Sequence, residues 1–448
     1  MTPHQPKKFK FIDLFAGIGG FHHALSQLGG ECVLAVEIDA NCRKVYKTTW
    51  PKLADDAFIA DIRSLTRNED QSQKPLNLIS TLVPDHDVLC AGFPCQPFSK
   101  SGNQEGILDQ TRGTLFFDIM EIVKAKKPRY LILENVRNLA GPRHAETFRT
   151  IIASLQECGY RVTSNPVILS PHTLPPSNGG TPQHRERVYI MAEYVGASSS
   201  ERELALDMSD NQSHAWNPTM WTLDSFLLQD DEIQNLERYR LSPEDEAVIR
   251  AWQAFVEGIS DDRLPGFPIW VDYFKSRPRY PADTPEWKRN FIKKNSDFYR
   301  ENKEFLDEWL KISWMHDRTF RVADFIASRR KFEWQARRFQ SKRGDRDLLK
   351  LAIQFRPSGV RVKAPNYLPT LVAITQTPFI GPRQRFLTPI EAGRLQGFPD
   401  SVFGSAIIED KHAYRQAGNA VNVGVVKYIA TRLFDKTNAP WLNYQNLP

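Results

Sequence analysis

The sequence predicts an α/β protein with a second, smaller domain, and two observations support this fold class. Over roughly the first 190 residues, short apolar strands alternate with helical segments, which is the pattern of βαβ units that build a mostly parallel sheet. After about Val195 this alternation stops, and apolar residues recur at helical spacing instead. The chain has 448 residues, enough for two or three domains.

The first βαβ unit is predicted near the amino terminus. Phe9–Phe15 is a strand, Ala16–Gly20 a glycine turn and Phe21–Leu28 a helix. Gly29-Gly30 ends that helix, because glycine readily adopts the left-handed conformation found after helix ends. Cys32–Ile38 is then the next strand.

Three later segments complete the predicted sheet. His86–Phe93, Tyr130–Glu134 and Arg187–Ala192 are short apolar runs of strand length. Between the first two, Thr114–Val123 is predicted to be a helix with one apolar face. That face consists of Leu115, Ile119, Ile122 and Val123.

Two helices are predicted in the second domain, which follows a polar stretch at 198–200. Ser242-Pro243 has the residue types of a helix start, and Thr284-Pro285 starts a second helix in the same way. The apolar residues at helical spacing after these starts are Val248, Trp252, Phe255, Val256 and Ile259 in the first, and Phe291, Phe298, Phe305 and Trp309 in the second. We expect these aromatic residues in a core, not as stacking platforms for DNA bases.

The composition is that of a soluble globular protein, with 41% hydrophobic and 25% charged residues. The five cysteines have no regular spacing, which argues against a disulfide framework and against a zinc site. We therefore expect no metal. Neither a signal peptide nor a membrane-spanning run is evident, so we expect a cytoplasmic protein without membrane contacts.

The net charge of +6 is modest, but basic residues concentrate in one segment. Between Arg329 and Arg346, eight Lys and Arg stand against two acids, with three aromatic residues interleaved. This segment is either a solvated helix face or a phosphate-binding patch.

A cofactor site is predicted at the glycine turn Asp13-Leu14-Phe15-Ala16-Gly17-Ile18-Gly19-Gly20. Glycines between a strand and a helix let the backbone approach a ligand closely. Glu37 ends the next strand, where a carboxylate can accept both hydroxyls of a ribose. These features fit a nicotinamide cofactor as well as S-adenosylmethionine. Asp61 follows where a third strand would end, either to contact adenine or to cap a helix.

Catalytic residues are predicted at the ends of two other strands. Cys95 follows the strand that ends at Phe93, and the neighbouring prolines restrict its loop. Glu134 ends the apolar strand that begins at Tyr130, so burial should raise its pKa. Arg185 and Arg187 precede the last strand and can orient a carboxylate and offset charge; for Arg185 a surface salt bridge is the alternative.

These blocks together resemble the bacterial cytosine-5 DNA methyltransferases of type II restriction-modification systems. DLFAGIGG, GFPCQPFS, ENV, QHRERVYI, RLQGFP and QAGNAV occur in that family's order, over about residues 9–192 and 385–432. The resemblance implies a Rossmann-like mixed sheet with helices on both faces, the class I fold of S-adenosylmethionine-dependent methyltransferases, plus a smaller target-recognition domain. It assigns residues 1–194 to the catalytic domain, 195–386 to target recognition, 387–412 to a hinge and return segment, and 413–448 to a helix that completes the catalytic domain.

The resemblance also implies roles for individual residues. Cys95 adds to carbon 6 of cytosine while Glu134 protonates the ring, and Arg187 supports the activated base and Glu134. Arg185 is counted with them among the catalytic residues. The base is held by Phe93, Pro94, Glu134, Asn135 and Arg187. The implied cofactor is S-adenosylmethionine, bound by Phe15, Ala16, Gly17, Gly19, Gly20, Glu37, Ile38, Asp61, Ile62, Pro94, Leu115, Asn419 and Ala420. Some relatives have an aromatic residue in place of Ile38 and a serine in place of Ala420.

The implied partner is double-stranded DNA, from which the target cytosine must flip to be reached. DNA contacts are expected from the loop residues Ser99, Lys100, Ser101 and Gln104 and from Arg337 and Arg338 in the basic segment. Residues 354–377 are expected to read bases. A monomeric, cytoplasmic bacterial enzyme with a cognate restriction endonuclease completes this prediction.

Three other functions compete with this interpretation. A tRNA cytosine-5 methyltransferase would share the catalytic residues, but the long segment between QHRER and RLQGFP favours DNA. A nicotinamide oxidoreductase would share the glycine turn but leaves GFPCQPFS, ENV and QAGNAV unexplained. A non-catalytic DNA-binding module would not need Cys95, Glu134 and Arg187 together.

Overall fold

The computed structural model describes residues 8–94, 115–163, 165–206, 208, 216–260, 263–336, 346–371, 377–404 and 408–441. The chain divides into two compact units: unit 1 is Met1–Pro218 with Ala392–Pro448, and unit 2 is Thr219–Glu391. The boundaries expected from the sequence, after residues 194 and 386, lie earlier in the chain than these, the first of them by more than 20 residues. In the described ranges, no helix is long and apolar enough to cross a membrane.

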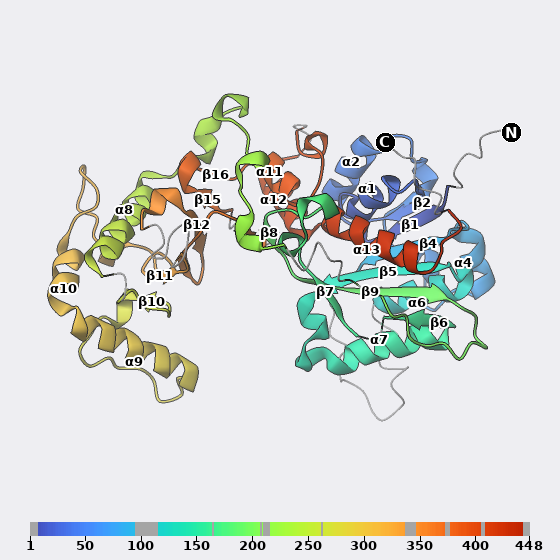
Figure 1. Cartoon of the computed structure of the whole chain (residues 1–448), viewed down its shortest axis with the longest axis horizontal. Helices are drawn as coiled ribbons and strands as arrows, with labels where there is room; N and C mark the ends of the chain where they lie inside the picture. Colours follow the sequence, from blue (N-terminus) through green and yellow to red (C-terminus); the bar gives the residue numbers. More distant parts are fainter. Residues whose placement is uncertain are drawn as a thin grey trace. The chain divides into compact units, whose positions relative to one another are not determined.

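Unit 1 is built on an eight-stranded sheet in the order β3-β2-β1-β4-β5-β9-β6, with β7 also paired to β9 (Figure 1). Its strands are β1 (Lys10–Leu14), β2 (Glu31–Val36), β3 (Phe58–Ile59), β4 (Val88–Gly92), β5 (Tyr130–Val136), β6 (Tyr160–Val162), β7 (Val167–Leu169) and β9 (Arg187–Tyr194). A short strand, β8 (Gln183–His184), precedes β9. Pairing is parallel from β3 to β5 and antiparallel at β9, which confirms the predicted mixed sheet.

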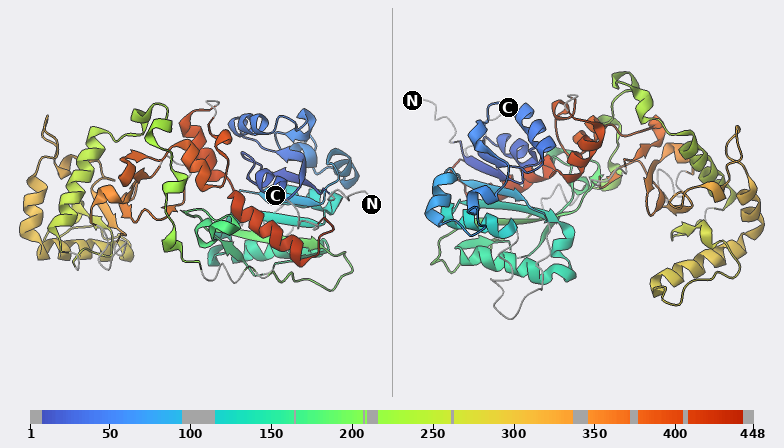
Figure 2. Two further views of the ribbon diagram at one scale, coloured as in Figure 1. Left: turned by 45° about the horizontal axis from the view of Figure 1, so that its top comes forward. Right: turned by 180° about the vertical axis from the view of Figure 1, so that it is seen from behind.

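Helices cover both faces of this sheet, as the views in Figure 2 show. Right-handed crossovers explain the arrangement: from β1 the chain moves toward β3, and it then returns through β4 toward β5. This puts α1 (Gly20–Ser26) and α2 (Ala40–Thr49) on one face and α4 (Leu76–Leu82) and α6 (Leu115–Lys126) on the other. Unit 1 also contains α3 (Arg63–Thr66), α7 (Ala145–Glu157), α12 (Asp410–Asn419) and α13 (Val423–Lys436).

The last segment of the chain packs against the first. Helix α13 contacts α1. The ring of Phe9 stacks on Trp441 at a centroid distance of 4.9 Å and meets Phe434 edge-on at 5.3 Å. Tyr130 in β5 hydrogen-bonds the hydroxyl of Thr437. The α12 segment is thereby held beside the carboxyl ends of the strands.

Unit 2 contains a six-stranded sheet in the order β10-β11-β13-β12-β15-β16. These strands are β10 (Ile269–Trp270), β11 (Lys331–Trp334), β12 (Ala352–Arg356), β13 (Gly359–Lys363), β15 (Phe379–Ile380) and β16 (Arg385–Phe386); β14 is Leu368–Pro369. Its helices are α8 (Pro243–Gly258), α9 (Glu286–Glu301) and α10 (Lys303–Lys311), and α11 (Pro389–Leu395) follows β16. The sequence analysis did not predict these strands.

The two helices predicted in unit 2 are present with one correction. Ser242 caps α8, because its hydroxyl accepts the backbone N–H of Asp245. The second helix was expected to continue through Trp309, but it ends at Glu301 and α10 begins at Lys303. Trp252, Phe255, Phe298 and Trp309 are all buried together, so their prediction as core residues is confirmed. The other two aromatic residues predicted for the core are only partly buried: Phe305 packs against this cluster, and Phe291 lies outside it.

The basic segment from Arg329 to Arg346 is not a helix where the structure describes it, because residues 331–334 form strand β11. Its described cations are largely used within unit 2. Arg329 pairs with Asp245 and Arg330 with Asp272, and Arg346 donates to the carbonyls of Val256 and Ile259. Arg337 and Arg338 lie outside the described residues.

Candidate active site

A cavity of about 530 Å³ lies at the carboxyl ends of β1, β2, β4 and β5 in unit 1. The chain leaves β1 and β4 toward opposite sides of the sheet, so this is the switch point where open α/β sheets bind ligands. The lining residues come from five stretches of the chain and from the region where β9 begins. They are Phe15–Ile18, Phe21, Glu37–Asp39, Cys42, Gly92–Pro94, Glu134–Val136, Arg185, Arg187, Arg415, Gln416 and Gly418–Val421.

The turn after β1 is held in an unusual backbone conformation. Phe15 has a φ of 58°, which is rare for a bulky residue and costs energy that the surroundings must offset. Gly17 also has a positive φ, of 57°, and a Cβ on it would meet no atom within 4 Å. The backbone of this turn is therefore open toward the cavity, as the glycine pattern predicted.

Glu37 connects that turn to the end of β2. Its Oε2 accepts the backbone N–H of Gly17 at 2.8 Å, and its Oε1 accepts that of Asp39 at 2.7 Å. Each carboxylate oxygen keeps a second lone pair. Asp39 in turn caps α2 and pairs with Arg415, 2.7 Å away. Glu37 is therefore held rigidly and can still accept two hydroxyls of a ligand.

Most of the predicted cofactor residues line the cavity. Those that do are Phe15, Ala16, Gly17, Glu37, Ile38, Pro94, Asn419 and Ala420. Gly20 lies beneath Val421, whose side chain a Cβ would meet at 2.5 Å, and Gly19 lies against Trp50. Ile62 is in the core and Leu115 packs against it. Asp61 accepts the backbone N–H of Arg63 at the start of α3, 2.9 Å away.

The loop that carries Cys95 begins beside Glu134. Gly92 pairs with Glu134 between β4 and β5, and a Cβ on Gly92 would lie 3.6 Å from Oε2 of Glu134. Asn135 donates from Nδ2 to the carbonyl of Phe93 at 2.9 Å, which fixes the start of the loop. Cys95, Ser99, Lys100, Ser101 and Gln104 themselves lie outside the described residues.

Glu134 is buried at the wall of the cavity, with 7% of its surface exposed. Burial raises its pKa, and the charges of Arg187 and Arg185 oppose that rise. Nε of Arg187 lies 3.0 Å from Oε1, but this oxygen accepts no well-aligned hydrogen bond within the described part of the chain. The pair is therefore an ion pair, and the carboxyl group retains hydrogen-bonding capacity toward a ligand.

Arg185 has a structural position that the sequence did not predict. It is 2% exposed and donates to the carbonyls of Gly418 at 2.8 Å and Ala420 at 2.7 Å. Burial, followed by the nearby charge of Arg187, lowers its pKa to about 9. Arg185 thus ties the turn before β9 to the carboxyl end of α12 and does not form a surface salt bridge.

Gln416 is a lining residue that the sequence analysis missed, although it lies in the QAGNAV block. It is 5% exposed, and neither atom of its amide group has a hydrogen-bond partner among the described residues. Since it faces the cavity, the amide offers a donor and an acceptor to a bound ligand. Its position as the first residue of that block was the signal that could have identified it.

Asp13 in β1 is fully buried, and neither carboxylate oxygen accepts a hydrogen bond from the described residues. Burial, and then the charge of Glu37, raises its pKa well above the usual value. The folded state therefore favours the protonated form of Asp13. Between about pH 4 and the raised pKa the unfolded chain ionises Asp13 but the folded protein does not, so the free energy of unfolding falls as the pH rises through this window.

We expect Asp13→Asn to remove that loss. The variant should gain stability relative to the unsubstituted protein by about 1.4 kcal/mol for each pH unit within this window. Urea unfolding of both proteins at about pH 5 and about pH 8 measures the difference. If the free energy of unfolding changed with pH by the same amount in both proteins, Asp13 would not be protonated in the folded state.

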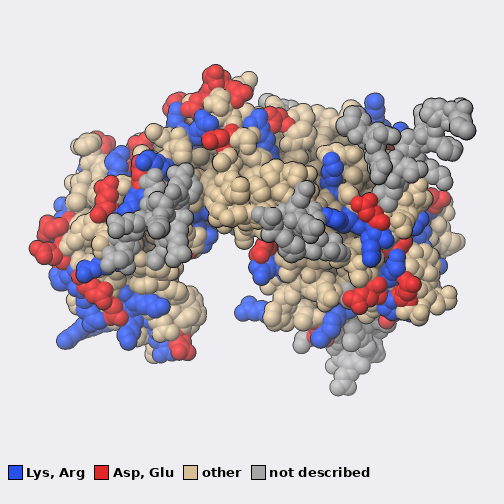
Figure 3. Space-filling view, viewed as in Figure 1, with Lys and Arg blue, Asp and Glu red and all other residues tan. Residues whose placement is uncertain are grey.

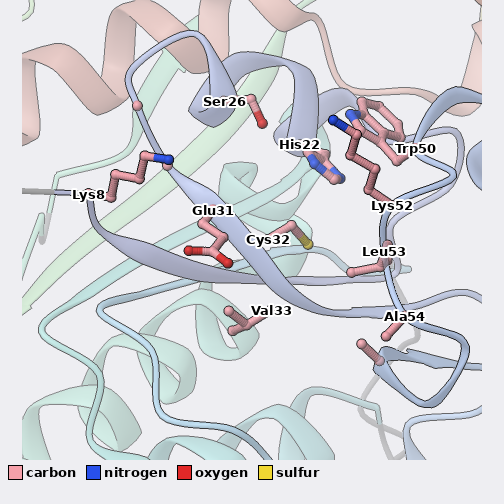
Figure 4. A pocket seen from close by; sticks show the side chains of 13 residues that line it. Lys8, His22, Ser26, Glu31, Cys32, Val33, Trp50, Lys52, Leu53 and Ala54 are labelled. Carbon is pink, nitrogen blue, oxygen red and sulfur yellow. The ribbon is translucent and has the colours of Figure 1, made fainter.

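Two other hollows lie in unit 1. One, of about 630 Å³, is at the amino end of β2, the edge opposite the cavity just described, and Figure 4 shows Lys8, Cys32, Trp50 and Lys52 around it. The other, of about 560 Å³, lies beside α3 and includes Asp61. In the part of the chain that the structure describes, no group of acidic, histidine or cysteine residues could hold a metal ion.

Comparisons with known proteins agree on one family. The family model for C-5 cytosine-specific DNA methylases matches residues 9–435. Type II methyltransferase M.AluI from Cellulosimicrobium cellulans is 37% identical, over 94% of this chain and 91% of that protein. Type II methyltransferase M.HgiCI from Herpetosiphon aurantiacus is 30% identical, over 95% of this chain and 97% of that protein.

Among solved structures, a protein encoded within prophage Cp of E. coli and described as a DNA modification methyltransferase is similar in fold. Its TM-score is 0.50 at 19% identity, with 96% of this chain and 99% of that chain covered. At this identity the likeness concerns the fold alone.

Proposed function

Because this chain belongs to the C-5 cytosine-specific DNA methylase family, we propose that it transfers the methyl group of S-adenosylmethionine to carbon 5 of cytosine in a specific duplex DNA sequence. The observation that carries the proposal is the position of Glu134. Its buried carboxyl group faces the same cavity as Glu37 and lies beside the strand end that leads to Cys95.

The cavity fits S-adenosylmethionine in size and in chemistry. About 530 Å³ is within the range of small-molecule sites. Glu37 would accept the ribose hydroxyls with its remaining lone pairs, the open backbone at Gly17 would approach the ligand closely, and Ile38, 71% exposed, would cover the adenine. When bound, this cofactor supplies an electrophilic methyl group.

Cys95 would be the nucleophile. In the sequence it directly follows Pro94, a residue that lines the cavity. Its thiolate would add to carbon 6 of cytosine, and Glu134 would deliver a proton to ring nitrogen 3. Carbon 5 then becomes nucleophilic and takes the methyl group. Loss of the carbon-5 proton, elimination of the Cys95 thiolate and return of the nitrogen 3 proton to Glu134 then restore the ring. Such positioned acid catalysis is typically worth about 100- to 10,000-fold.

Arg185 and Arg187 would act on the same carboxyl group differently. Arg187 would orient Glu134 through their ion pair, whereas Arg185 would hold the segment that supplies Asn419 and Ala420 to the cavity. Phe93 and Asn135 would set the position of the Cys95 loop through their hydrogen bond.

The remaining proposals concern the partners. Unit 2 would recognise the DNA sequence and unit 1 would receive the flipped base, since carbon 6 cannot be reached inside the base stack. By analogy with the type II relatives, the modification would protect host DNA from a cognate endonuclease, and the enzyme would act as a monomer in the cytoplasm.

Methyl transfer to DNA is the experiment that tests this function. We expect labelled methyl groups from S-adenosylmethionine to appear in duplex DNA and not in tRNA. Bisulfite sequencing of DNA from cells that express the protein should show protected cytosines at one position of one sequence. Label in tRNA alone would instead establish the RNA methyltransferase alternative.

A further inference from the structure

The segment from Lys275 to Lys294 in unit 2 is the source of this inference. It contains seven Lys and Arg against two acids, a net charge of +5, when the whole chain carries only +6. The cations are Lys275, Arg277, Arg279, Lys288, Arg289, Lys293 and Lys294. All of them are exposed except Lys288, which is partly exposed. We call this the 275–294 surface.

The surface consists of a loop and of the first part of α9, and these two parts are adjacent. Residues 276–283 form a loop whose ends are both attached to α9: Ser296 near the carboxyl end donates to the carbonyl of Lys275, and Thr284-Pro285 leads into the first turn. The loop must therefore run back along about 15 Å of the helix. Figure 3 shows Lys and Arg side chains gathered over the part of unit 2 where Figure 1 labels α9.

These cations differ from their neighbours in having no carboxylate partner. Within the described residues, none of the seven forms an ion pair; Lys294 lies over the ring of Phe267. On the next helix, by contrast, Lys303 pairs with Asp307 and Lys311 with Glu308. Cations that stabilise a solvated helix face usually pair with acids one turn away, as those of α10 do. The unpaired cations of α9 are free for an external anion.

The geometry fits the backbone of duplex DNA. Arg289 and Lys293 are one helical turn apart, about 6 Å along the axis, so the two cations can reach neighbouring phosphates of one strand, which follow one another every ~3.4 Å along the DNA axis. Trp287 is 61% exposed and Tyr280 44% exposed, and both can donate a hydrogen bond to a phosphate. The acids within the surface are Asp283 and Glu286, which the seven cations outnumber, and the neighbouring Asp272 and Asp297 are themselves paired with arginines.

We propose that the 275–294 surface binds DNA phosphates without reading bases, and so supplies sequence-independent affinity. This inference rests on the proposed function for its partner. It differs from the prediction for Arg329–Arg346, whose described arginines are used within unit 2. Phosphate contacts position a protein on duplex DNA but carry no sequence information.

The test is DNA binding by a triple variant of the full chain, Arg289→Ala with Lys293→Ala and Lys294→Ala. The matched control is Lys303→Ala with Lys311→Ala and Arg318→Ala, which removes three exposed cations of the same unit that are all ion-paired. Fluorescence anisotropy would use two labelled duplexes of equal length, with the methylated sequence intact or scrambled, at about 50 to 200 mM salt.

We expect the α9 variant to bind both duplexes at least about 10-fold more weakly, with the slope of log affinity against log salt reduced by about 2 to 3. The control variant should bind within about twofold of the unsubstituted protein. Both variants should keep the circular dichroism spectrum and the urea unfolding midpoint of the unsubstituted protein, which establishes that they fold.

Three outcomes would overturn the proposal. Unchanged affinity of the α9 variant would show that these cations do not contact DNA. A loss confined to the intact sequence would assign them to base reading. If the α9 variant bound single-stranded DNA or RNA, added as competitors, more weakly but bound duplex DNA normally, another partner would be assigned to this surface. Since the unsubstituted protein is assayed for methylation in parallel, failure of the enzymatic function would be seen separately from failure of this surface.

Discussion

Cys95→Ser is expected to abolish methyl transfer, with a fall in rate of about 10,000-fold or more. A serine hydroxyl ionises far less readily than a thiol, and without a nucleophile at carbon 6 carbon 5 of cytosine cannot attack the methyl group. Affinity for S-adenosylmethionine should change little, because the residues proposed to bind it, Glu37 and the turn at Phe15 and Gly17, follow other strands than the one that leads to Cys95. Initial rates and calorimetric binding of the cofactor separate the two effects.

The control for this variant is Cys158→Ser at the end of α7, a partly exposed thiol away from the cavity. It should retain full activity. Duplex DNA with 5-fluorocytosine at the target should also trap a covalent adduct on the peptide that contains Cys95, since fluorine cannot leave as a proton does. If mass spectrometry found no such adduct, or if Cys95→Ser had normal rates, the assignment of Cys95 as the nucleophile would be contradicted.

The sheet of unit 1 could be predicted because its strands are buried on both faces. Such strands appear as continuous apolar runs between glycine turns, and the predicted strands at Phe9, Cys32, His86, Tyr130 and Arg187 all exist. Right-handed crossovers then decide which face of the sheet each helix covers, once the order of the strands is known. Polar residues that end these strands meet at one edge, so Glu37 and Glu134 could be expected to share a cavity.

The strands of unit 2 could not be predicted in the same way. They are short, and several are only two residues long, as β10, β15 and β16 are. A strand of that length shows no alternation of polar and apolar residues, and its pairing depends on distant segments. Gln354 and Phe355, expected in a base-reading segment, are instead buried in β12.

Details of the site that depend on tertiary contacts also escaped prediction. The sequence places Arg185 beside a catalytic block, but its bonds to Gly418 and Ala420 join positions more than 200 residues apart. Likewise, the positive φ of Phe15 could not be predicted, because bulky residues such as phenylalanine rarely adopt it. Local pattern identifies which residues gather at a site, whereas long-range contacts decide what each of them does there.

Glu134→Gln is expected to lower the rate of methyl transfer by about 100- to 10,000-fold while leaving cofactor affinity nearly unchanged. The amide keeps the size and can still donate a hydrogen bond, but it cannot give up a proton to ring nitrogen 3. Glu193→Gln is the matched control: Glu193 is equally buried in β9, paired with Arg161, and lies opposite Tyr130 at the far end of β5. Normal rates from Glu134→Gln would contradict the proton transfer.

The pH profile distinguishes a proton donor from a merely structural glutamate. Burial raises the pKa of Glu134, so its reactive protonated form is lost as pH rises through that pKa, and kcat/KM should fall there. Cys95 acts in the opposite direction, because its thiolate increases with pH, and the two together give a bell-shaped profile. Arg187 lowers the pKa of Glu134, so Arg187→Met should move the descending limb to higher pH and Glu134→Gln should remove it. A descending limb that persists unchanged in Glu134→Gln would assign that ionisation to another group.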